Sequence, residues 1–335
     1  MTNSSIIFVW IGLKLPIYAR KSLQFCNMNN PQSEILLLTN ATNTSALRGE
    51  INIVYFGNNE IHKLRCKLPQ MQYKGEFWEN TSLRFLLLNE YVDNTRLKSF
   101  FHAELDNFIF NLYGLDSLMN NLGNGIFAPR DAVDRAISSL IYCNRGESLS
   151  DLVGLYSCSR PPLNDMDAMG KYACKYQHYF HALPTESFLY NSTKYPLVKP
   201  EIISGIFDAA AIGQYILGVD PIHYQFKPCW NGFVNENCNI DLNSVDFLVE
   251  DSRIFIQYKA SGIKFQIFNI HLHSKNWKMF HKIMLNGDVL KKLNNGDKSI
   301  ISNHLMILVG PMFSVIYRFL ALLRRMYKCI IREIF

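Results

Sequence analysis

The sequence predicts an α/β protein, a sheet flanked by helices. Three short runs rich in β-branched and large apolar residues occur early in the chain, at residues 6–11, 34–38 and 51–56. The segments between them, such as residues 17–27, have more polar, helix-compatible patterns. Strands that alternate with helices are typical of an α/β sheet and not of a sandwich of two sheets.

Composition limits the class of protein further. The chain has 335 residues, of which 48% are hydrophobic and 13% aromatic, so it can bury a large core and is not a disordered chain. A net charge of +6 without a basic run argues against a nucleic-acid partner. We predict one catalytic domain over residues 1–293, a linker at 294–301 and a separate tail at 302–335.

The cysteines and the first residues predict a reducing compartment. Eight cysteines are present and none forms a CxxC pair, so buried reduced thiols are the default interpretation. The opening MTNSSIIFVWIG has no basic residue before its apolar run, which is not typical of a signal peptide. We therefore expect a cytoplasmic protein.

Two acids follow the next predicted strand. Residues 77–91 have apolar side chains at helical spacing, and the strand predicted at 97–103 leads directly into Glu104 and Asp106. Acids two residues apart on an extended chain point the same way and repel each other unless a cation lies between them. Because ligands of open α/β sheets bind beyond the carboxyl ends of strands, we interpret this pair as a metal site; a solvated turn is the alternative.

Two histidines occur late in the chain. Strands are predicted at residues 253–258 and 264–273, and the second contains His271 and His273. Alternation along a strand places both imidazoles on one side. We expect one to be a metal ligand or a phosphate donor, and the other to be a hydrogen-bonded core residue.

Five stretches together carry a resemblance. They are FVWIGLKLPIYARKSL from residue 8, SLR from residue 82 ahead of ELD at 104–106, LNDMDAMG from residue 163, FDAAAIGQYILGVDP from residue 207, and FNIHLHSKNW from residue 268. In this order they resemble the motifs of a sugar-nucleotide-dependent glycosyltransferase of the GT-A fold, a Rossmann-like mixed sheet. The resemblance covers roughly residues 5–280. It departs from the family at Glu104, which replaces the first Asp of the DxD motif by a longer oxygen ligand.

The resemblance implies roles for individual residues. The metal ligands would be Glu104, Asp106, His271 and His273. The residues near the donor nucleotide and its phosphates would be Trp10, Gly12, Arg84 and Lys275. The catalytic candidates would be Asp165, as base or sugar contact, then Asp208 and Glu236. The metal would be Mn²⁺ or Mg²⁺, since carboxylates suit hard divalent ions. The partners would be a nucleoside-diphosphate sugar and a glycan or lipid-linked acceptor.

Several alternatives stay open at this point. Asp165 and Asp208 could each cap a helix, Glu236 could be a loop acid, and Trp10 could pack instead of stacking on a base. A nucleotidyltransferase would share the α/β sheet and the paired acids, although the loop after the first strand is poor in glycine. A catalytically inactive binding or scaffold protein of the same fold is the other alternative.

The sequence of the tail, residues 302–335, indicates where in the cell the protein is located. Residues 305–323 are mostly apolar but are interrupted by Gly310, Pro311 and Arg318. Beyond them Arg325 and Arg332 continue a spacing of seven among apolar residues. A basic amphipathic helix of this kind lies in a membrane interface and is attracted to anionic lipid. We predict a peripheral protein on the cytoplasmic face of a membrane; packing of this helix on the catalytic domain or on a partner subunit is the alternative.

Overall fold

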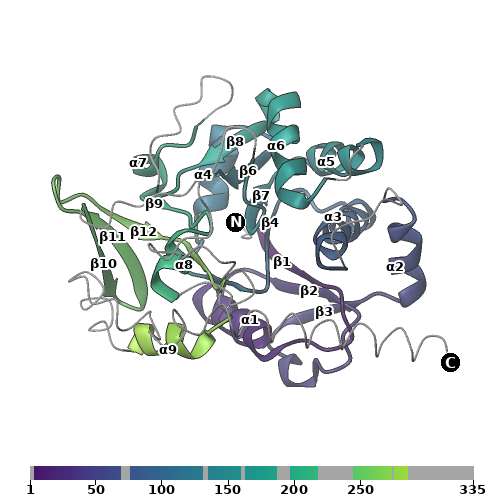
Figure 1. The fold of residues 1–335 in the computed structure, drawn as a ribbon, viewed down its shortest axis with the longest axis horizontal. Coiled ribbons are helices and arrows are strands. Elements are labelled where there is room, and N and C mark those ends of the chain that lie inside the picture. The colour runs from purple at the N-terminus through teal and green to yellow at the C-terminus, as the bar shows by residue number, and fades with distance from the viewer. Residues whose placement is uncertain are drawn as a thin grey trace, which may run out of the picture.

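A mixed seven-stranded sheet forms the centre of the protein (Figure 1). The computed structural model describes residues 4–68, 76–130, 135–159, 163–186, 197–217, 244–273 and 275–285. The strands run in the spatial order β3-β2-β1-β4-β7-β6-β8. They are β1 (Ser5–Trp10), β2 (Ile35–Thr39), β3 (Asn52–Tyr55), β4 (Phe100–Ala103), β6 (Ile126–Pro129), β7 (Leu140–Cys143) and β8 (Phe180–Leu183). β7 runs antiparallel to both of its neighbours, whereas β1 is parallel to β2 and to β4.

Helices cover both faces of this sheet. They are α1 (Ile17–Asn29), α2 (Asn58–Arg65), α3 (Glu76–Thr95), α4 (Leu115–Leu122), α5 (Gly146–Cys158) and α6 (Asp165–Lys175), with short 3-10 turns η1 (Ser45–Leu47) and η2 (Gln177–Tyr179). Alternation along β1 sends Ile7 and Val9 into one core, with α3, α5 and α6, and Ile6 and Phe8 into the other, with α1. The predicted α/β class with a mixed sheet between helices is confirmed.

Two smaller sheets extend the domain on one side (Figure 1). A four-stranded sheet contains β10 (Val245–Glu250), β11 (Arg253–Tyr258), β12 (Lys264–Ile267) and β9 (Gly205–Ile206). A two-stranded ladder joins β5 (Asn107–Ile109) to β13 (Asn269–His271). The helices of this region are α7 (Pro200–Ile203), α8 (Ile212–Leu217) and α9 (Trp277–Leu285).

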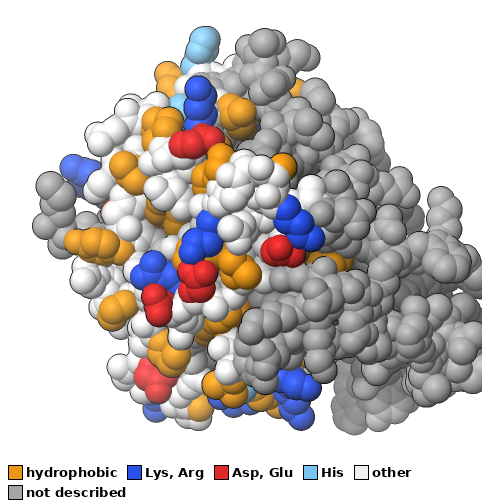
Figure 2. Space-filling model, turned by 90° about the vertical axis from the view of Figure 1, so that its left-hand side faces the viewer, with side chains coloured by type: hydrophobic (Ala, Val, Ile, Leu, Met, Phe, Trp, Pro, Cys, Tyr) orange, Lys and Arg blue, Asp and Glu red, His pale blue; other side chains and the backbone are white. Residues whose placement is uncertain are grey.

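The outer side of this region carries mixed charges. Figure 2 shows acidic and basic side chains lying next to one another there, with hydrophobic side chains between them. Two of the pairs involve strands of the four-stranded sheet: Lys264 of β12 lies 2.5 Å from Glu250 of β10, and Lys259, which follows β11, lies 3.2 Å from Asp246 of β10. Pairs this exposed contribute little to stability.

Most predicted elements match the structure, and one is corrected. The runs at 6–11, 34–38 and 51–56 are β1, β2 and β3, and the segment at 17–27 begins α1. The single strand predicted at 264–273 is wrong, because it divides at Phe268 into β12 and β13. The Phe268 N–H donates to the Ile206 carbonyl and its own carbonyl accepts from Phe110, so the chain crosses between two sheets there.

The described part of the chain contains no helix that is both long and apolar enough to cross a membrane. The predicted linker at 294–301 and the tail at 302–335 lie outside the described residues, so the amphipathic helix stays a prediction from sequence.

Candidate active site

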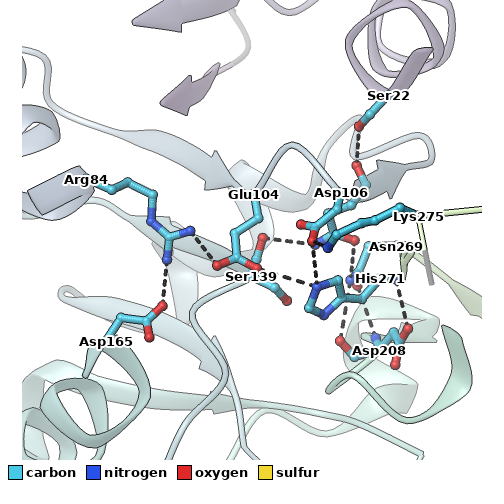
Figure 3. Close-up of polar contacts among 11 residues, drawn as sticks. Ser22, Arg84, Glu104, Asp106, Ser139, Asp165, Asp208, Asn269, His271 and Lys275 are labelled. Carbon is cyan, nitrogen blue, oxygen red and sulfur yellow. Dashed lines mark hydrogen bonds and ion pairs between the residues drawn. The ribbon is translucent and has the colours of Figure 1, made fainter. Parts of the chain in front are cut away.

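The two acids lie at the turn that follows β4. β4 is buried along its whole length, and Asn107 N–H donates to the Glu104 carbonyl at 3.1 Å, which closes a tight turn before β5 begins. From the sequence we expected both residues on one extended chain; in the structure they lie in this turn instead. Their carboxylates nevertheless point into one cluster (Figure 3), and Leu105 between them is buried.

A histidine from the far end of the chain reaches the same turn. β13 pairs with β5 in antiparallel register, with His271 opposite Asn107, and the Leu272 N–H donates to the Asp106 carbonyl. This ladder carries the imidazole of His271 to the two carboxylates (Figure 3). Its Nε2 lies 3.4 Å from Asp106 Oδ2 and 3.6 Å from Glu104 Oε2.

These three side chains form a possible metal site. One ligand atom from each of Glu104, Asp106 and His271 lies within 4.8 Å of the others, and all three residues are partly buried. Two carboxylate oxygens and an imidazole nitrogen suit Mn²⁺ or Mg²⁺, with the nitrogen favouring Mn²⁺. The donor set therefore fits the ion that the sequence motifs predict. His273 is not part of this group: β13 ends at His271, and the two rings lie 6.1 Å apart.

Arg84 holds the Glu104 side of the cluster. Its guanidinium is buried, pairs with Glu104 Oε1 through one terminal nitrogen, and lies 2.8 Å from Asp165 Oδ2 through the other (Figure 3). Burial raises the pKa of the Asp165 carboxyl to about 6; Arg84 opposes this shift and Glu104 adds to it. Because Glu104 is longer than Asp, it reaches Arg84 with one oxygen and the His271 ring with the other.

Lys275 and His271 balance the Asp106 side. The ammonium of Lys275 pairs with Asp106 Oδ2. Burial would raise the pKa of Asp106, but Lys275 and His271 outweigh it and hold the pKa well below its usual range. Burial lowers the pKa of His271, but Asp106 reverses the shift, and the pKa is raised overall. Lys275 adopts a left-handed backbone conformation with φ of 58°, which is uncommon for a residue other than glycine and occurs often at functional sites.

The other predicted site residues are not among the three grouped side chains. Asp208 is fully buried, and its carboxylate accepts backbone N–H groups at the start of α8 and that of His271. It lies four residues before α8 begins, so it binds the first N–H groups of this helix without being its N-cap residue. Burial raises the pKa of Asp208, and those N–H donors oppose the shift. Trp10 ends β1, and its indole lies over Gly12, whose N–H donates to Asn40. Glu236 lies outside the described residues.

One capping alternative is wrong. Asp165 is the first residue of α6 and does not cap it; the cap is Asn164, whose side chain accepts the Asp167 N–H at 2.8 Å. A side chain at the N-cap, one residue earlier, reaches the free N–H groups of the first turn. Asp165 is consequently free to turn its carboxylate toward Arg84.

Sequence reasoning missed two asparagines that tie the site together. Asn269 Nδ2 donates to Asn107 Oδ1 at 2.9 Å, and Asn107 Nδ2 donates to the Ser139 carbonyl at 2.9 Å. The Glu104 N–H donates to the same Ser139 carbonyl. These hydrogen bonds therefore connect the turn that carries Glu104 and Asp106 with β13, the strand that carries His271. In the sequence, each asparagine could be noticed as a polar residue beside large apolar ones: Asn107 stands between Asp106 and Phe108, and Asn269 lies two residues before His271.

No protein-family model and no curated protein matches the sequence. Solved structures to which parts of the chain are similar include several glycosyltransferases. Mouse xyloside xylosyltransferase 1 has a TM-score of 0.38 and 10% identity, covering 55% of this chain and 86% of that one.

Two further structures belong to the same class. The galactosyltransferase LgtC, solved with donor and acceptor sugar analogues, has a TM-score of 0.37 and 15% identity, covering 54% of this chain and 74% of that one. The PaToxG glycosyltransferase has a TM-score of 0.36 and 11% identity, covering 51% and 68%. Since these likenesses are remote, the function below is argued from this chain's own residues.

Proposed function

We propose that this chain is a metal-dependent glycosyltransferase. It would move a sugar from a nucleoside-diphosphate sugar to a hydroxyl of a glycan or lipid-linked acceptor. The observation that carries this proposal is the grouping of Glu104, Asp106 and His271 within 4.8 Å of one another, with the ammonium of Lys275 on the same carboxylate. Two acids, an imidazole and a lysine ammonium at the end of a sheet strand fit the recognition of a metal-bound diphosphate.

The reaction defines what these groups have to do. The bond from the anomeric carbon to the diphosphate oxygen breaks, a bond to the acceptor oxygen forms, and the acceptor hydroxyl loses its proton. A divalent cation held by Asp106, His271 and one oxygen of Glu104 would neutralise negative charge that develops on the leaving diphosphate. Lys275 can add a second positive charge to the same phosphates once it leaves Asp106.

Asp165 is the leading candidate for the base or for a contact to the sugar. A pKa of about 6 suits a carboxylate that accepts a proton near neutral pH. Its Oδ2 is bound to Arg84, which also pairs with Glu104 and so keeps the Asp165 carboxylate next to the Glu104 side of the cluster. Asp208 and Glu236 follow it as candidates, with Asp208 disfavoured because backbone N–H groups already occupy its carboxylate.

Transfer assays test the proposal. The full chain would be incubated with Mn²⁺ and a panel of nucleotide sugars, and release of the nucleoside diphosphate would be measured beside an Asp106→Ala variant. We expect release from one donor, lost in EDTA and in the variant. Release of a sugar 1-phosphate instead would identify transfer of the nucleotidyl group, as in a nucleotidyltransferase, and metal-dependent binding without turnover would identify an inactive binding protein.

The membrane placement is a separate proposal that rests on the sequence of residues 302–335. We propose that this segment attaches the enzyme to anionic lipid, where a lipid-linked acceptor would lie. The full chain and a chain ending at residue 301 would be compared by flotation on liposomes containing phosphatidylserine. The full chain should float and the shortened chain should not; a full chain that stays at the bottom of the gradient would exclude this placement.

A further inference from the structure

A buried carboxylate outside the metal cluster holds the backbone of one of its members. Asp208 has no exposed surface, and its two oxygens accept four backbone N–H groups. Oδ1 accepts from Ala211 at 2.8 Å and Ile212 at 2.9 Å, whereas Oδ2 accepts from Gly213 at 2.8 Å and His271 at 2.9 Å. A carboxylate has about four acceptor sites, so this set uses them all. Asp208 therefore joins the start of α8 to the histidine strand (Figure 3).

Direct packing strengthens this joint. A Cβ atom added at Gly213 would lie 2.0 Å from the His271 carbonyl oxygen and 2.8 Å from Asp208 Oδ2. Backbone cannot give way as a flexible side chain can, so only glycine allows α8 to approach β13 this closely. Asn269, also on β13, adds a further hydrogen bond between the two segments, since its Oδ1 accepts the Asp208 N–H at 3.1 Å.

The imidazole of His271 needs such a support. A metal-ligating histidine is usually oriented by a partner on its second ring nitrogen. In the described part of the chain, Nδ1 of His271 is buried and has no hydrogen-bond partner. The position of the ring is consequently set through its backbone, and the His271 N–H has Asp208 as its acceptor.

We propose that Asp208 is a positioning residue that holds His271 in reach of Asp106 and Glu104, with Gly213 as the second part of the same joint. This inference rests on the proposed function, because it assigns His271 as a metal ligand. It replaces a direct chemical role for Asp208: the carboxylate acts on the metal through the backbone of His271 and touches no substrate.

The test compares two substitutions of the same kind in the full chain. Asp208→Asn replaces one accepting oxygen by an amide that cannot accept the N–H groups it faces. Asp116→Asn is the matched control: Asp116 is also buried and accepts the backbone N–H of Ser4 at 3.0 Å, but it lies on α4 with partners outside the site. Affinity for Mn²⁺ would be measured by calorimetry with and without UDP, and the bound ion would be followed by electron paramagnetic resonance.

We expect Asp208→Asn to weaken Mn²⁺ binding by about 10–100-fold, the range for loss of a group that orients a metal ligand, and to alter the Mn²⁺ spectrum. Asp116→Asn should keep the affinity and the spectrum of the unmodified chain even where it lowers the melting temperature. Equal affinity in Asp208→Asn and the unmodified chain would overturn this inference alone. Absence of Mn²⁺ binding by the unmodified chain would overturn the proposed function with it.

A second measurement covers the case in which Asp208→Asn does not fold. Hydrogen exchange of the His271 amide in the unmodified chain reports whether its N–H is held. We expect slow exchange in the absence of Mn²⁺, as for the buried strands, because Asp208 already accepts that N–H. Exchange as fast as in the exposed turn at Ser261 would overturn the inference.

Discussion

Glu104 and Asp106 lie two residues apart, yet different kinds of cation balance them. Glu104 faces Arg84, a buried guanidinium that cannot lose its proton and that also holds Asp165. Asp106 faces the ammonium of Lys275, whose side chain is 34% exposed, and the imidazole of His271. The Glu104 side is thus a fixed framework, whereas the Asp106 side consists of groups that can move or lose a proton. Substitutions on the two sides should therefore have different consequences.

The largest effect is expected on the stability of the Glu104 side. Arg84→Met leaves the buried carboxylate of Asp165 and the partly buried one of Glu104 without their cation, and we expect a loss of about 3–5 kcal/mol in the free energy of unfolding, measured in urea. The control is Arg65→Met, which removes an ion pair with Glu79 on the surface and should cost about 1 kcal/mol or less. Similar losses in the two variants would show that Arg84 is not a framework cation.

The second largest effect is expected on the rate of transfer, when Asp106 is substituted. Asp106→Asn should lower the rate of transfer by about a hundredfold or more, since it removes a charged ligand that acts on the transition state. Its melting temperature should stay close to that of the unmodified chain, because Lys275 can turn to solvent. Asp246→Asn, which breaks a surface pair with Lys259, should leave the rate unchanged. A rate within a few-fold of normal for Asp106→Asn would contradict the difference between the two sides.

Asp165→Asn separates the framework role from the chemistry. If Asp165 is the base, the rate should fall by about a hundredfold, while Mn²⁺ affinity is kept because Arg84 still has Glu104. The unmodified enzyme should then lose rate as pH falls through about 6, since the raised pKa means the carboxyl becomes protonated there. A loss below about tenfold, or no such pH dependence, would leave Asp165 only as a partner of Arg84.

The smallest effect concerns Lys275, and its sign depends on the ligand. Lys275→Met removes a positive charge beside Asp106, so Mn²⁺ alone should bind more tightly. The same change should weaken UDP binding in saturating Mn²⁺ by about tenfold, because one charge-assisted hydrogen bond to phosphate is lost. Calorimetry of the two titrations measures both signs. A change of the same sign in both would contradict the assignment of Lys275 to the movable side.

The two sides also differ in how far the sequence predicts them. The turn that carries Glu104 and Asp106 follows a buried apolar strand, and the runs that became β1, β2 and β3 have the local patterns of strands, so the acids' place at the sheet edge could be predicted. Helical spacing around Arg84 likewise predicted α3.

The Asp106 side includes His271, and its formation depends on pairing between segments that are distant in the sequence. β13 meets β5 across about 160 residues of chain, and no local periodicity records that register. The single late strand was therefore predicted without its break at Phe268. For the same reason the amides of Asn107 and Asn269, and the bond from His271 to Asp208, could not be predicted from residue spacing alone.

A crystal structure of the full chain with Mn²⁺ and UDP would show directly which residues hold the metal ion. We expect one anomalous peak for Mn²⁺ at coordinating distance, about 2.0–2.6 Å for an oxygen ligand, from Asp106, with Glu104 and His271 Nε2 also bound and Lys275 turned to the phosphates. A Mn²⁺ ion bound elsewhere, with Lys275 still paired to Asp106 beside an ordered diphosphate, would contradict this expectation.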